Sequence, residues 1–277
     1  MRIRATVAAL TGTLALSALV VPAAQAVDGP NGPQKLAASV AKADGDNIGD
    51  TKITKVTVNG GKDIVVGTTE KKKFTVAVTA TDPEGVGAGS AFLWHGPTED
   101  TADGVFTPDN FNGKCTVVNA TTSTCTVTVI ADPKVIFTND VAGGGWKVYA
   151  AAGGNDGDQA TIEDAKSNAR VQRAARLTTN ASPEPIKKGK TLTVTGALTR
   201  ANWETSKYAG YTKQSVKLQY KKKGATSYST LKTITSDTKG NLKTTVKASA
   251  DGYYRYVFAG TSTTPAVTST SDFVDVN

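Results

Sequence analysis

The feature that most constrains this chain is a series of short runs in which apolar and polar residues alternate, separated by turn-forming residues. Alternation with a period of two places one face of a strand in a core and the other in solvent. Many short strands with turn signals between them are typical of antiparallel β-sandwiches. The runs are residues 52–58, 74–80, 91–94, 115–118, 125–130, 134–137, 146–151, 167–174, 176–180, 191–198, 215–221, 228–235, 241–248, 253–259 and 272–276.

The composition agrees with this pattern. Beyond residue 26 the chain holds 39 Thr and 25 Val but only 8 Leu. β-Branched residues favour strands, whereas a helical bundle or coiled coil needs Leu, Glu and Ala at helical spacing, so those folds are excluded and a doubly wound α/β enzyme is disfavoured. One His and two Cys also exclude a His-rich or multi-Cys metal site.

The first residues have the pattern of an export signal. Arg2 and Arg4 precede an apolar stretch at 5–21, and residues 24–26 (AQA) form a cleavage signal. A membrane anchor is the weaker interpretation, because Thr, Gly and Ser interrupt the stretch and no other window reaches membrane-spanning length. We expect a secreted protein, extracellular or associated with the cell wall, without a membrane span.

The rest of the chain contains a gapped internal duplication. Residues 67–76 correspond to 189–194, and residues 145–153 correspond to 252–260. A duplication of this length indicates two tandem domains. The expected organisation is a signal peptide at 1–26, a flexible leader at 27–50, an acidic β-sandwich with one disulfide at 51–174 and a basic β-sandwich at 175–277.

The two cysteines lie on either side of a predicted turn. Antiparallel pairing about Ala120 places Cys115 opposite Cys125, as a cross-strand disulfide requires. In an oxidising compartment we expect the pair to be bonded. A redox-active pair would need closer spacing, such as Cys-x-x-Cys.

The second half carries motifs that resemble the bacterial immunoglobulin-like domains at the C-termini of exported proteins. They are residues 191–196 (TLTVTG), 214–220 (QSVKLQY), 228–231 (YSTL), 236–242 (SDTKGNL) and 250–254 (ADGYY). The resemblance implies an all-β chain of two tandem immunoglobulin-like antiparallel β-sandwiches, with Tyr254 at a tyrosine corner. The whole chain is also similar to small exported proteins sometimes labelled calcium-binding. Such sandwiches serve many roles, so the fold does not identify a ligand.

Charge is distributed unevenly between the halves. Residues 27–174 hold 14 Lys/Arg against 18 Asp/Glu, and residues 175–277 hold 16 against 6, a net charge of +10. Such a surface favours polyanions. For a secreted protein we expect a cell-wall polyanion or polysaccharide as the partner, and no specific nucleic acid. The alternative is that lysines on edge strands only prevent aggregation.

A polar connection at 201–213 holds three aromatic residues. Exposed rings at the tip of a sandwich can stack on sugars, with neighbouring polar side chains supplying hydrogen bonds. Rings also close the ends of cores, so burial is the alternative. The predicted ligand-binding residues are Trp203, Tyr208, Tyr211 and Lys213 from this connection, and Lys221, Lys222 and Lys223 from the lysine run that follows.

A second candidate site would hold calcium, which needs several converging oxygen ligands. Four acidic residues lie in the loop expected before the last strand of the first domain, and Asp82 and Glu84 could contribute from another loop. Solvated turn residues are the alternative, because Asp bonds to nearby backbone in turns. The predicted metal ligands are Asp156, Asp158, Glu163 and Asp164.

Catalysis finds little support in the sequence. The chain has one histidine, His95, and lacks the Gly-x-Ser-x-Gly motif of a serine nucleophile that a histidine could activate. We therefore expect a secreted, non-catalytic protein without a cofactor that binds cell-envelope polyanions or polysaccharide through its basic second domain. Two alternatives stay open: a calcium-binding structural protein with the ion in the acidic first domain, and a sugar- or protein-directed binding module such as a protease inhibitor.

Overall fold

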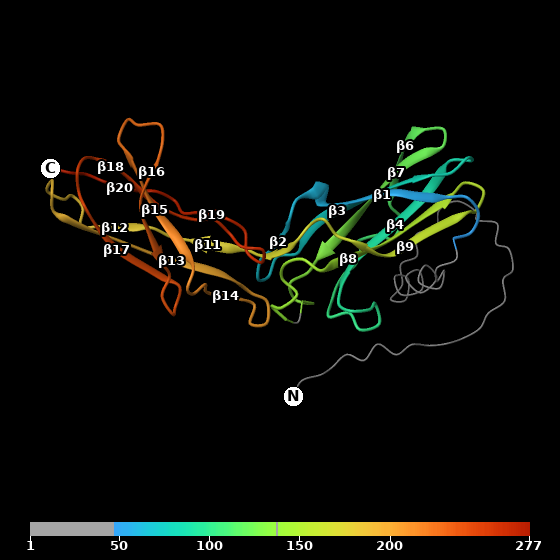
Figure 1. The fold of residues 1–277 in the computed structure, drawn as a ribbon, viewed down its shortest axis with the longest axis horizontal. Coiled ribbons are helices and arrows are strands. Elements are labelled where there is room, and N and C mark those ends of the chain that lie inside the picture. The colour runs from blue at the N-terminus through green and yellow to red at the C-terminus, as the bar shows by residue number, and fades with distance from the viewer. Residues whose placement is uncertain (1–46, 137) are drawn as a thin grey trace.

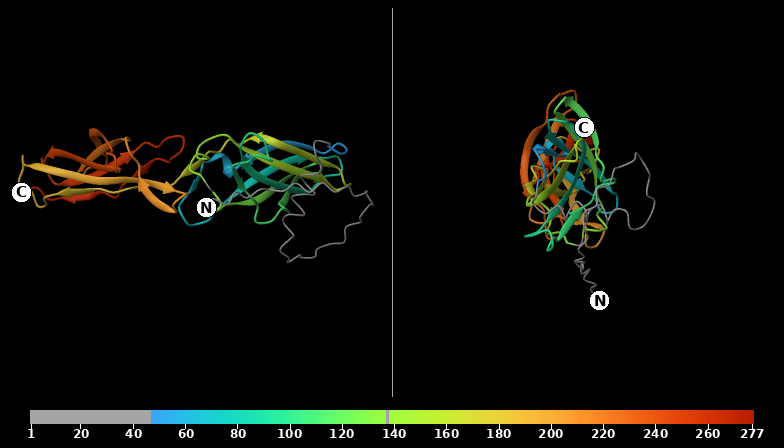
Figure 2. Two further views of the ribbon diagram at one scale, coloured as in Figure 1. Left: turned by 90° about the horizontal axis from the view of Figure 1, so that it is seen from below. Right: turned by 90° about the vertical axis from the view of Figure 1, so that its right-hand side faces the viewer.

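The computed structural model describes residues 47–136 and 138–277. They form two β-sandwiches joined end to end in an elongated molecule (Figure 1, Figure 2). The predicted signal peptide and most of the predicted leader lie outside the described residues. Within the described part, no helix is long and apolar enough to cross a membrane.

The first sandwich contains the elements from β1 to β10. They are β1 (Lys52–Val58), the 3-10 turn η1 (Asn59–Gly61), β2 (Ile64–Val66), β3 (Lys72–Thr81), β4 (Val86–His95), β5 (Gly104–Phe106), β6 (Lys114–Asn119), β7 (Thr122–Ala131), β8 (Trp146–Gly154), β9 (Gln159–Lys166) and β10 (Val171–Arg173). One sheet has the order β1-β3-β7-β6 and the other β5-β4-β8-β9. These orders correspond to strands A-B-E-D and C′-C-F-G of the immunoglobulin fold, which confirms the predicted fold class for this half.

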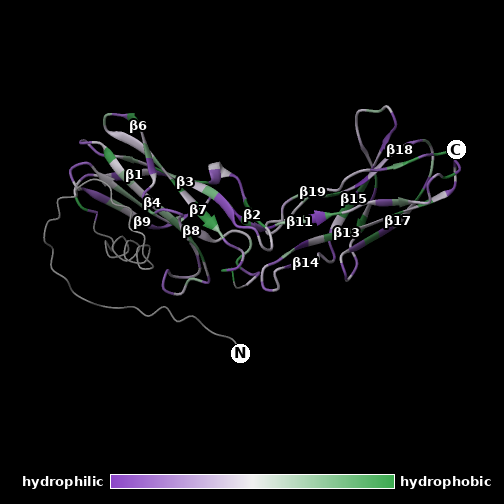
Figure 3. Cartoon of the chain, turned by 180° about the vertical axis from the view of Figure 1, so that it is seen from behind, coloured by the Kyte–Doolittle hydropathy of each residue, from purple (hydrophilic) through white to green (hydrophobic). Residues whose placement is uncertain are grey.

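The alternation of residue types explains how this sandwich forms. Along β3, Phe74, Val76 and Val78 are buried, while the residues between them are exposed or half-buried. Burial alternates in the same way along β7, and both sandwiches contain hydrophobic and hydrophilic stretches of strand (Figure 3). The ring of Trp146 from β8 stacks on Phe106 from β5 with centroids 4.4 Å apart. Burial of these side chains supplies the main driving force for folding.

The predicted disulfide is present. Cys115 on β6 lies directly opposite Cys125 on β7, and their Sγ atoms are bonded. The bond joins an exposed edge strand to a strand whose inward side chains are part of the core.

Three expectations for the first half are wrong. Residues 134–136 do not form a strand, because the Val135 N–H bonds to the Asp132 carbonyl across a turn. Most of the loop expected at 155–164 is strand β9. The predicted leader also extends too far, since Ile48 and Gln159 exchange backbone hydrogen bonds of 2.9 Å.

The second sandwich contains the strands from β11 to β20. They are β11 (Ala175–Leu177), β12 (Asn180–Ser182), β13 (Thr191–Asn202), β14 (Lys207–Gly210), β15 (Ser215–Lys222), β16 (Ser229–Thr235), β17 (Asn241–Lys247), β18 (Gly252–Phe258), β19 (Val267–Thr268) and β20 (Asp272–Val274). In one sheet the long strand β13 pairs with β11, β12, β14 and β17; the other has β16-β15-β18, with β19 and β20 both paired to β18. This is again an immunoglobulin-like arrangement, here with strands A-B-E against C′-C-F-G.

The core of the second sandwich contains two tyrosines from one strand. Tyr254 and Tyr256 are buried on β18. The Tyr256 hydroxyl donates to the Val194 carbonyl of the opposite sheet at 2.9 Å. The tyrosine-corner assignment is wrong, however: the hydroxyl that bonds to the backbone carbonyl of Asp251, at 3.1 Å, belongs to Tyr220 on β15.

The two sandwiches meet without a linker. β10 ends at Arg173 and β11 begins at Ala175. The N–H of Arg173 bonds to Thr263, and that of Ala174 bonds to Val66. Burial, together with the nearby charge of Arg200, lowers the pKa of Arg173 to about 10. The predicted division between residues 174 and 175 stays a prediction, although it coincides with this change of strands.

Candidate functional site

The aromatic connection lies at the junction between the sandwiches rather than at a free tip. Trp203 is only 3% exposed and packs against the core of the first sandwich. Its indole N–H donates to the Gly67 carbonyl oxygen at 3.0 Å. The ring is therefore inaccessible to a sugar, and the expectation that Trp203 binds a ligand is wrong because the two domains bury it.

The other two rings of this connection are also covered. The Arg176 guanidinium lies 3.6 Å from the centroid of the Tyr208 ring. Tyr211 is 8% exposed, with the Arg200 guanidinium 4.0 Å from its ring centroid. Lys213 is exposed, but the aromatic rings of the same connection are covered. The structure therefore does not bring these four residues together as a sugar platform.

The lysine run at the end of β15 has a different environment. Lys222 and Lys223 are exposed, and Lys221 is half-buried on the outer face of the sheet. The Lys221 ammonium lies 5.1 Å from the ring centroids of both Tyr228 and Tyr253. These contacts identify a group of aromatic and cationic side chains, of which only Lys221 was predicted from the sequence.

We call this group the aromatic–cation row: Lys221, Tyr228, Tyr253, Arg255 and Phe273. Its members come from four neighbouring segments, namely the residue before β16, then β15, β18 and β20 (Figure 1). Strand register aligns them, because Lys221 lies opposite Tyr253 and Tyr253 lies opposite Phe273. Side chains directly opposite one another on a sheet interact, so the row forms one continuous surface.

The side chains of the row contact one another. The Tyr253 and Phe273 ring centroids are 5.1 Å apart. The Arg255 guanidinium lies 3.6 Å from the Tyr228 ring centroid, and its Nε donates to Gln219 at 3.0 Å. Cations at these distances are attracted to the faces of aromatic rings. The Arg255 guanidinium thus covers one face of the Tyr228 ring, whereas the cations nearest Tyr253 and Phe273 lie farther from the ring centroids, at 5.1 and 5.6 Å.

The charge around the row is predominantly positive. Lys223 lies beside it, with its ammonium 5.6 Å from the Phe273 ring centroid and 3.4 Å from an Asp251 carboxylate oxygen. That ion pair is the one salt bridge within the second sandwich among the described residues. Lys221 itself contacts two rings and no carboxylate in the described chain, so its charge is available to an anion.

Strand alternation could have revealed the part of this site that lies on β15 and β18. Tyr254 and Tyr256 on β18 face the core, so Tyr253 and Arg255 between them must face outward. The same alternation along β15 places Gln219 and Lys221 on that outer face. The prediction from the sequence included the lysine run but none of the rings on β18 and β20.

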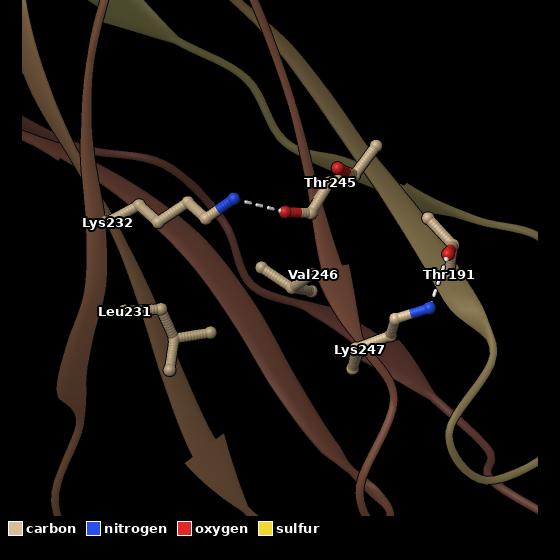
Figure 4. Close-up of a pocket in the computed structure, with 6 residues that line it drawn as sticks. All are labelled: Thr191, Leu231, Lys232, Thr245, Val246 and Lys247. Atoms are coloured by element: carbon tan, nitrogen blue, oxygen red, sulfur yellow. Dashed lines mark hydrogen bonds between the residues drawn. The ribbon is translucent and has the colours of Figure 1, made fainter.

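A groove of about 480 Å³ lies elsewhere on the second sandwich, between the free edges of β16 and β17 (Figure 4). Its lining residues are Thr191, Leu231, Lys232, Thr245, Val246 and Lys247. Both of its lysines are engaged within the chain: Lys232 Nζ donates to the Thr245 carbonyl at 2.6 Å and Lys247 Nζ to the Thr191 hydroxyl at 3.1 Å. The groove therefore offers fewer free cations than the row.

Part of the predicted metal site is brought together. Carboxylate oxygens of Asp156 and Asp158 lie within 4.8 Å of one another and of Asp82, and Asp82 forms a similar group with Asp50 and Glu84. Asp82 is buried and accepts hydrogen bonds from the Thr51 hydroxyl and the Glu84 N–H. A divalent cation bound by oxygens would relieve the repulsion within such a cluster.

Glu163 and Asp164 are not part of this cluster, so their assignment as ligands with Asp156 and Asp158 is wrong. The reason is that residues 159–166 are strand β9 rather than loop. A strand advances about 3.3 Å per residue and carries both side chains away from Asp158.

The one histidine has contacts that hold it in place. His95 Nδ1 lies 2.5 Å from an Asp103 carboxylate oxygen, and its ring is tilted against Trp146 with centroids 5.6 Å apart. These contacts join the end of β4 to the loop that leads into β5.

Comparison with known proteins gives only distant structural likenesses. No protein family model matches the chain, and no curated protein is similar to it in sequence. A marsupial T cell receptor has 11% identity and a TM-score of 0.40, covering 80% of this chain and 72% of that one. The fibronectin(III)-like modules of Clostridium thermocellum CbhA have 13% identity and a TM-score of 0.31, covering 80% and 93%. The D00-D0 domain of intimin has 12% identity and a TM-score of 0.26, covering 79% and 99%. The strand order of this chain, rather than these likenesses, defines its immunoglobulin-like fold.

Proposed function

We propose that this chain is an exported, non-catalytic binding protein whose basic second sandwich associates with anionic polymers of the cell envelope. The observation that carries the proposal is the charge of that sandwich, where 16 Lys/Arg stand against 6 Asp/Glu. A surface with such an excess of one sign concentrates counter-charged polymers and speeds their association.

The placement of the lysines supports binding over a purely protective role. Lysines that only protect a sheet from aggregation belong on its edge strands. Lys217 and Lys221 instead lie on β15, which is paired on both sides by β16 and β18. Cations on an interior strand do nothing to protect an edge, so they favour a ligand on the outer face.

Export is supported by the signal pattern and by the disulfide. Bonded cysteines persist in oxidising compartments and are rare in the cytosol. The first sandwich, with its net negative charge, would then be held away from an anionic polymer and leave the second to make the contact.

Binding to anionic polymers is tested by measuring the affinity of the full chain for isolated cell envelopes as a function of salt. Replacing Lys221, Lys222 and Lys223 together by Gln should weaken binding. The slope of the logarithm of the binding constant against the logarithm of the salt concentration should become shallower by roughly two to three. The matched control replaces exposed lysines of the first sandwich, Lys52, Lys72 and Lys114, and should change little. A wild-type chain that shows no salt-dependent binding to envelopes or to any soluble polyanion overturns the proposal.

A second candidate function is calcium-dependent stabilisation of the first sandwich, which the convergence of Asp82, Asp156 and Asp158 favours. A ligand that binds only the native state raises the melting temperature. Millimolar calcium should therefore raise the melting temperature of the wild-type chain, and Asp156→Asn with Asp158→Asn should abolish the rise. A melting temperature that is the same in calcium and in chelator rejects this function.

A further inference from the structure

The aromatic–cation row exposes rings that the core does not need. The core of the second sandwich already contains Tyr254, Tyr256 and Phe258 on the inward face of β18. Tyr253 and Phe273 add a second set of rings on the outward face, where both are only half-buried. Partly exposed rings on an outer face, flanked by lysines, are accessible to a ligand that approaches the sheet.

The row combines two kinds of contact, stacking on aromatic rings and charge pairing with cations. Ring faces suit the apolar faces of sugar rings, whereas a polyphosphate chain has no such face to offer. Ammonium and guanidinium groups suit carboxylates or phosphates, which a neutral sugar lacks. Because Lys221 lies 5.1 Å from the centroids of Tyr228 and Tyr253, both kinds of contact occur within one strand-to-strand spacing.

The geometry of the row suits a chain rather than a compact ligand. Its members cross four adjacent segments, and neighbouring strands of a sheet lie about 4.8 Å apart. The Arg255 guanidinium lies on the Tyr228 ring and its Nε bonds to Gln219, so contacts within the sheet position both side chains before a ligand binds. A preorganised surface loses little side-chain freedom on binding.

We propose that the aromatic–cation row is a binding site for an anionic polysaccharide, with Tyr253 and Phe273 stacking on sugar rings and Lys221 contacting the acidic groups. This rests on the proposed function and names the ligand class within it. The site involves no catalytic step, and it replaces the junction residues Trp203 and Tyr211 as the sugar-directed part of the second sandwich.

The test compares three soluble probes by calorimetry with the full chain at low salt: polygalacturonate, neutral dextran and inorganic polyphosphate. The wild-type chain should bind polygalacturonate, bind dextran at least tenfold more weakly, and keep part of its polygalacturonate affinity in high salt, because stacking is not screened. The double variant Tyr253→Leu with Phe273→Leu removes the rings but retains apolar bulk. It should weaken polygalacturonate binding at least tenfold and leave polyphosphate binding within twofold of wild type.

Two further variants make the result specific. Lys221→Gln should weaken binding of both polyanions. Phe92→Leu is the matched control, because Phe92 is a half-buried ring on the corresponding sheet of the first sandwich, stacked on Tyr149 with centroids 4.9 Å apart. It should leave both affinities unchanged. If the double variant melts before it can be measured, the single variant Tyr253→Leu takes its place.

The outcomes distinguish this proposal from the proposed function. If the double variant binds polygalacturonate as wild type does, or if wild type binds polyphosphate but not polygalacturonate, the polysaccharide site is rejected while polyanion binding stands. If wild type binds neither polyanion, the polysaccharide site is rejected, and the proposed function is rejected with it when isolated envelopes are not bound either.

Discussion

Trp203, which belongs to the second sandwich, donates its indole N–H to the carbonyl oxygen of Gly67 in the first sandwich at 3.0 Å. Its ring lies against the core of the first sandwich and is 3% exposed. One side chain thus contributes to the stability of both domains and to the angle between them. Replacing it with Ala should lower the free energy of unfolding by about 3 kcal/mol, the low end for a buried Trp.

The same substitution should loosen the junction. Small-angle scattering of Trp203→Ala should show a broader distribution of overall dimensions than wild type. Trp203→Phe keeps most of the packing and loses the hydrogen bond, so it should cost about 1 kcal/mol and leave the scattering unchanged. An Ala variant with wild-type melting and scattering would show that Trp203 does not couple the domains.

Most of the fold could be predicted from the sequence, because alternation along strands depends on local residue order. The duplicated segments occupy equivalent strands: residues 67–76 lead into β3 and 189–194 into β13, while 145–153 form β8 and 252–260 contain β18. Strand β9 was missed because its sequence, QATIEDAK, has the polar residues of a loop; its outward side faces solvent and its pairing with β8 forms only in the folded sheet.

The candidate site was predictable only in part. The charge excess and the lysine run are properties of the sequence and needed no structure. The junction, by contrast, is a long-range contact: Gly67 and Trp203 are 136 residues apart, and no local pattern shows that one will cover the other. The row depends likewise on the register between β18 and β20, which side-chain alternation alone does not determine.

A buried hydroxyl joins the two sheets of the second sandwich, because Tyr256 on β18 donates to the Val194 carbonyl on β13. Removing it in Tyr256→Phe should cost about 1 kcal/mol at neutral pH. Burial raises the pKa of Tyr256 above that of an exposed tyrosine, near 10. Above pH 10 the unfolded chain releases this proton and the native state keeps it, so wild-type stability falls as pH rises.

The stability of the Tyr256→Phe variant should lack this pH dependence. The difference in the free energy of unfolding between wild type and variant, measured by urea titration, should therefore shrink between pH 9 and pH 11. Tyr253→Phe is the control, since Tyr253 lies on the outer face of the same strand. A disadvantage for Tyr256→Phe that stays constant over this range would show that burial does not keep the hydroxyl protonated.

An ion pair in the first sandwich should make stability depend on acid. The Arg170 side chain bonds to Asp63, with an Nη2 to Oδ2 distance of 2.7 Å, and this bond lowers the pKa of the carboxyl. Below about pH 4 the unfolded chain takes up the proton first, so the stability that the pair contributes is lost as pH falls through the lowered pKa.

Asp63→Asn should therefore be less stable than wild type by about 1 kcal/mol at pH 7, and the difference should vanish in strong acid. Thermal melting between pH 7 and pH 2 measures both the stability difference at neutral pH and its loss in acid. The more exposed pair of Asp109 and Lys73 serves as the comparison, and Asp109→Asn should change the melting temperature little at any pH. If the melting temperatures of Asp63→Asn and wild type differ by the same amount at every pH down to 2, the ion pair does not make stability depend on pH.

The last prediction concerns the open edges beside the groove in Figure 4. β17 pairs only with β13 among the described strands, so its outward backbone groups are free to pair with another chain. Lys232 occupies one of them by donating to the Thr245 carbonyl, and Leu231 beside it is 42% exposed and forms a β-bulge. A lysine and a bulge are both devices that keep edges apart.

Lys232→Val should therefore promote association between copies, seen as dimers or larger species by light scattering at concentrations where wild type is monodisperse. Lys243→Val removes the same charge from an exposed position on β17 without uncovering a carbonyl, and it should associate less. If the two variants behave alike, lost charge alone explains the association. The difference between them measures how far the Lys232 hydrogen bond protects the edge.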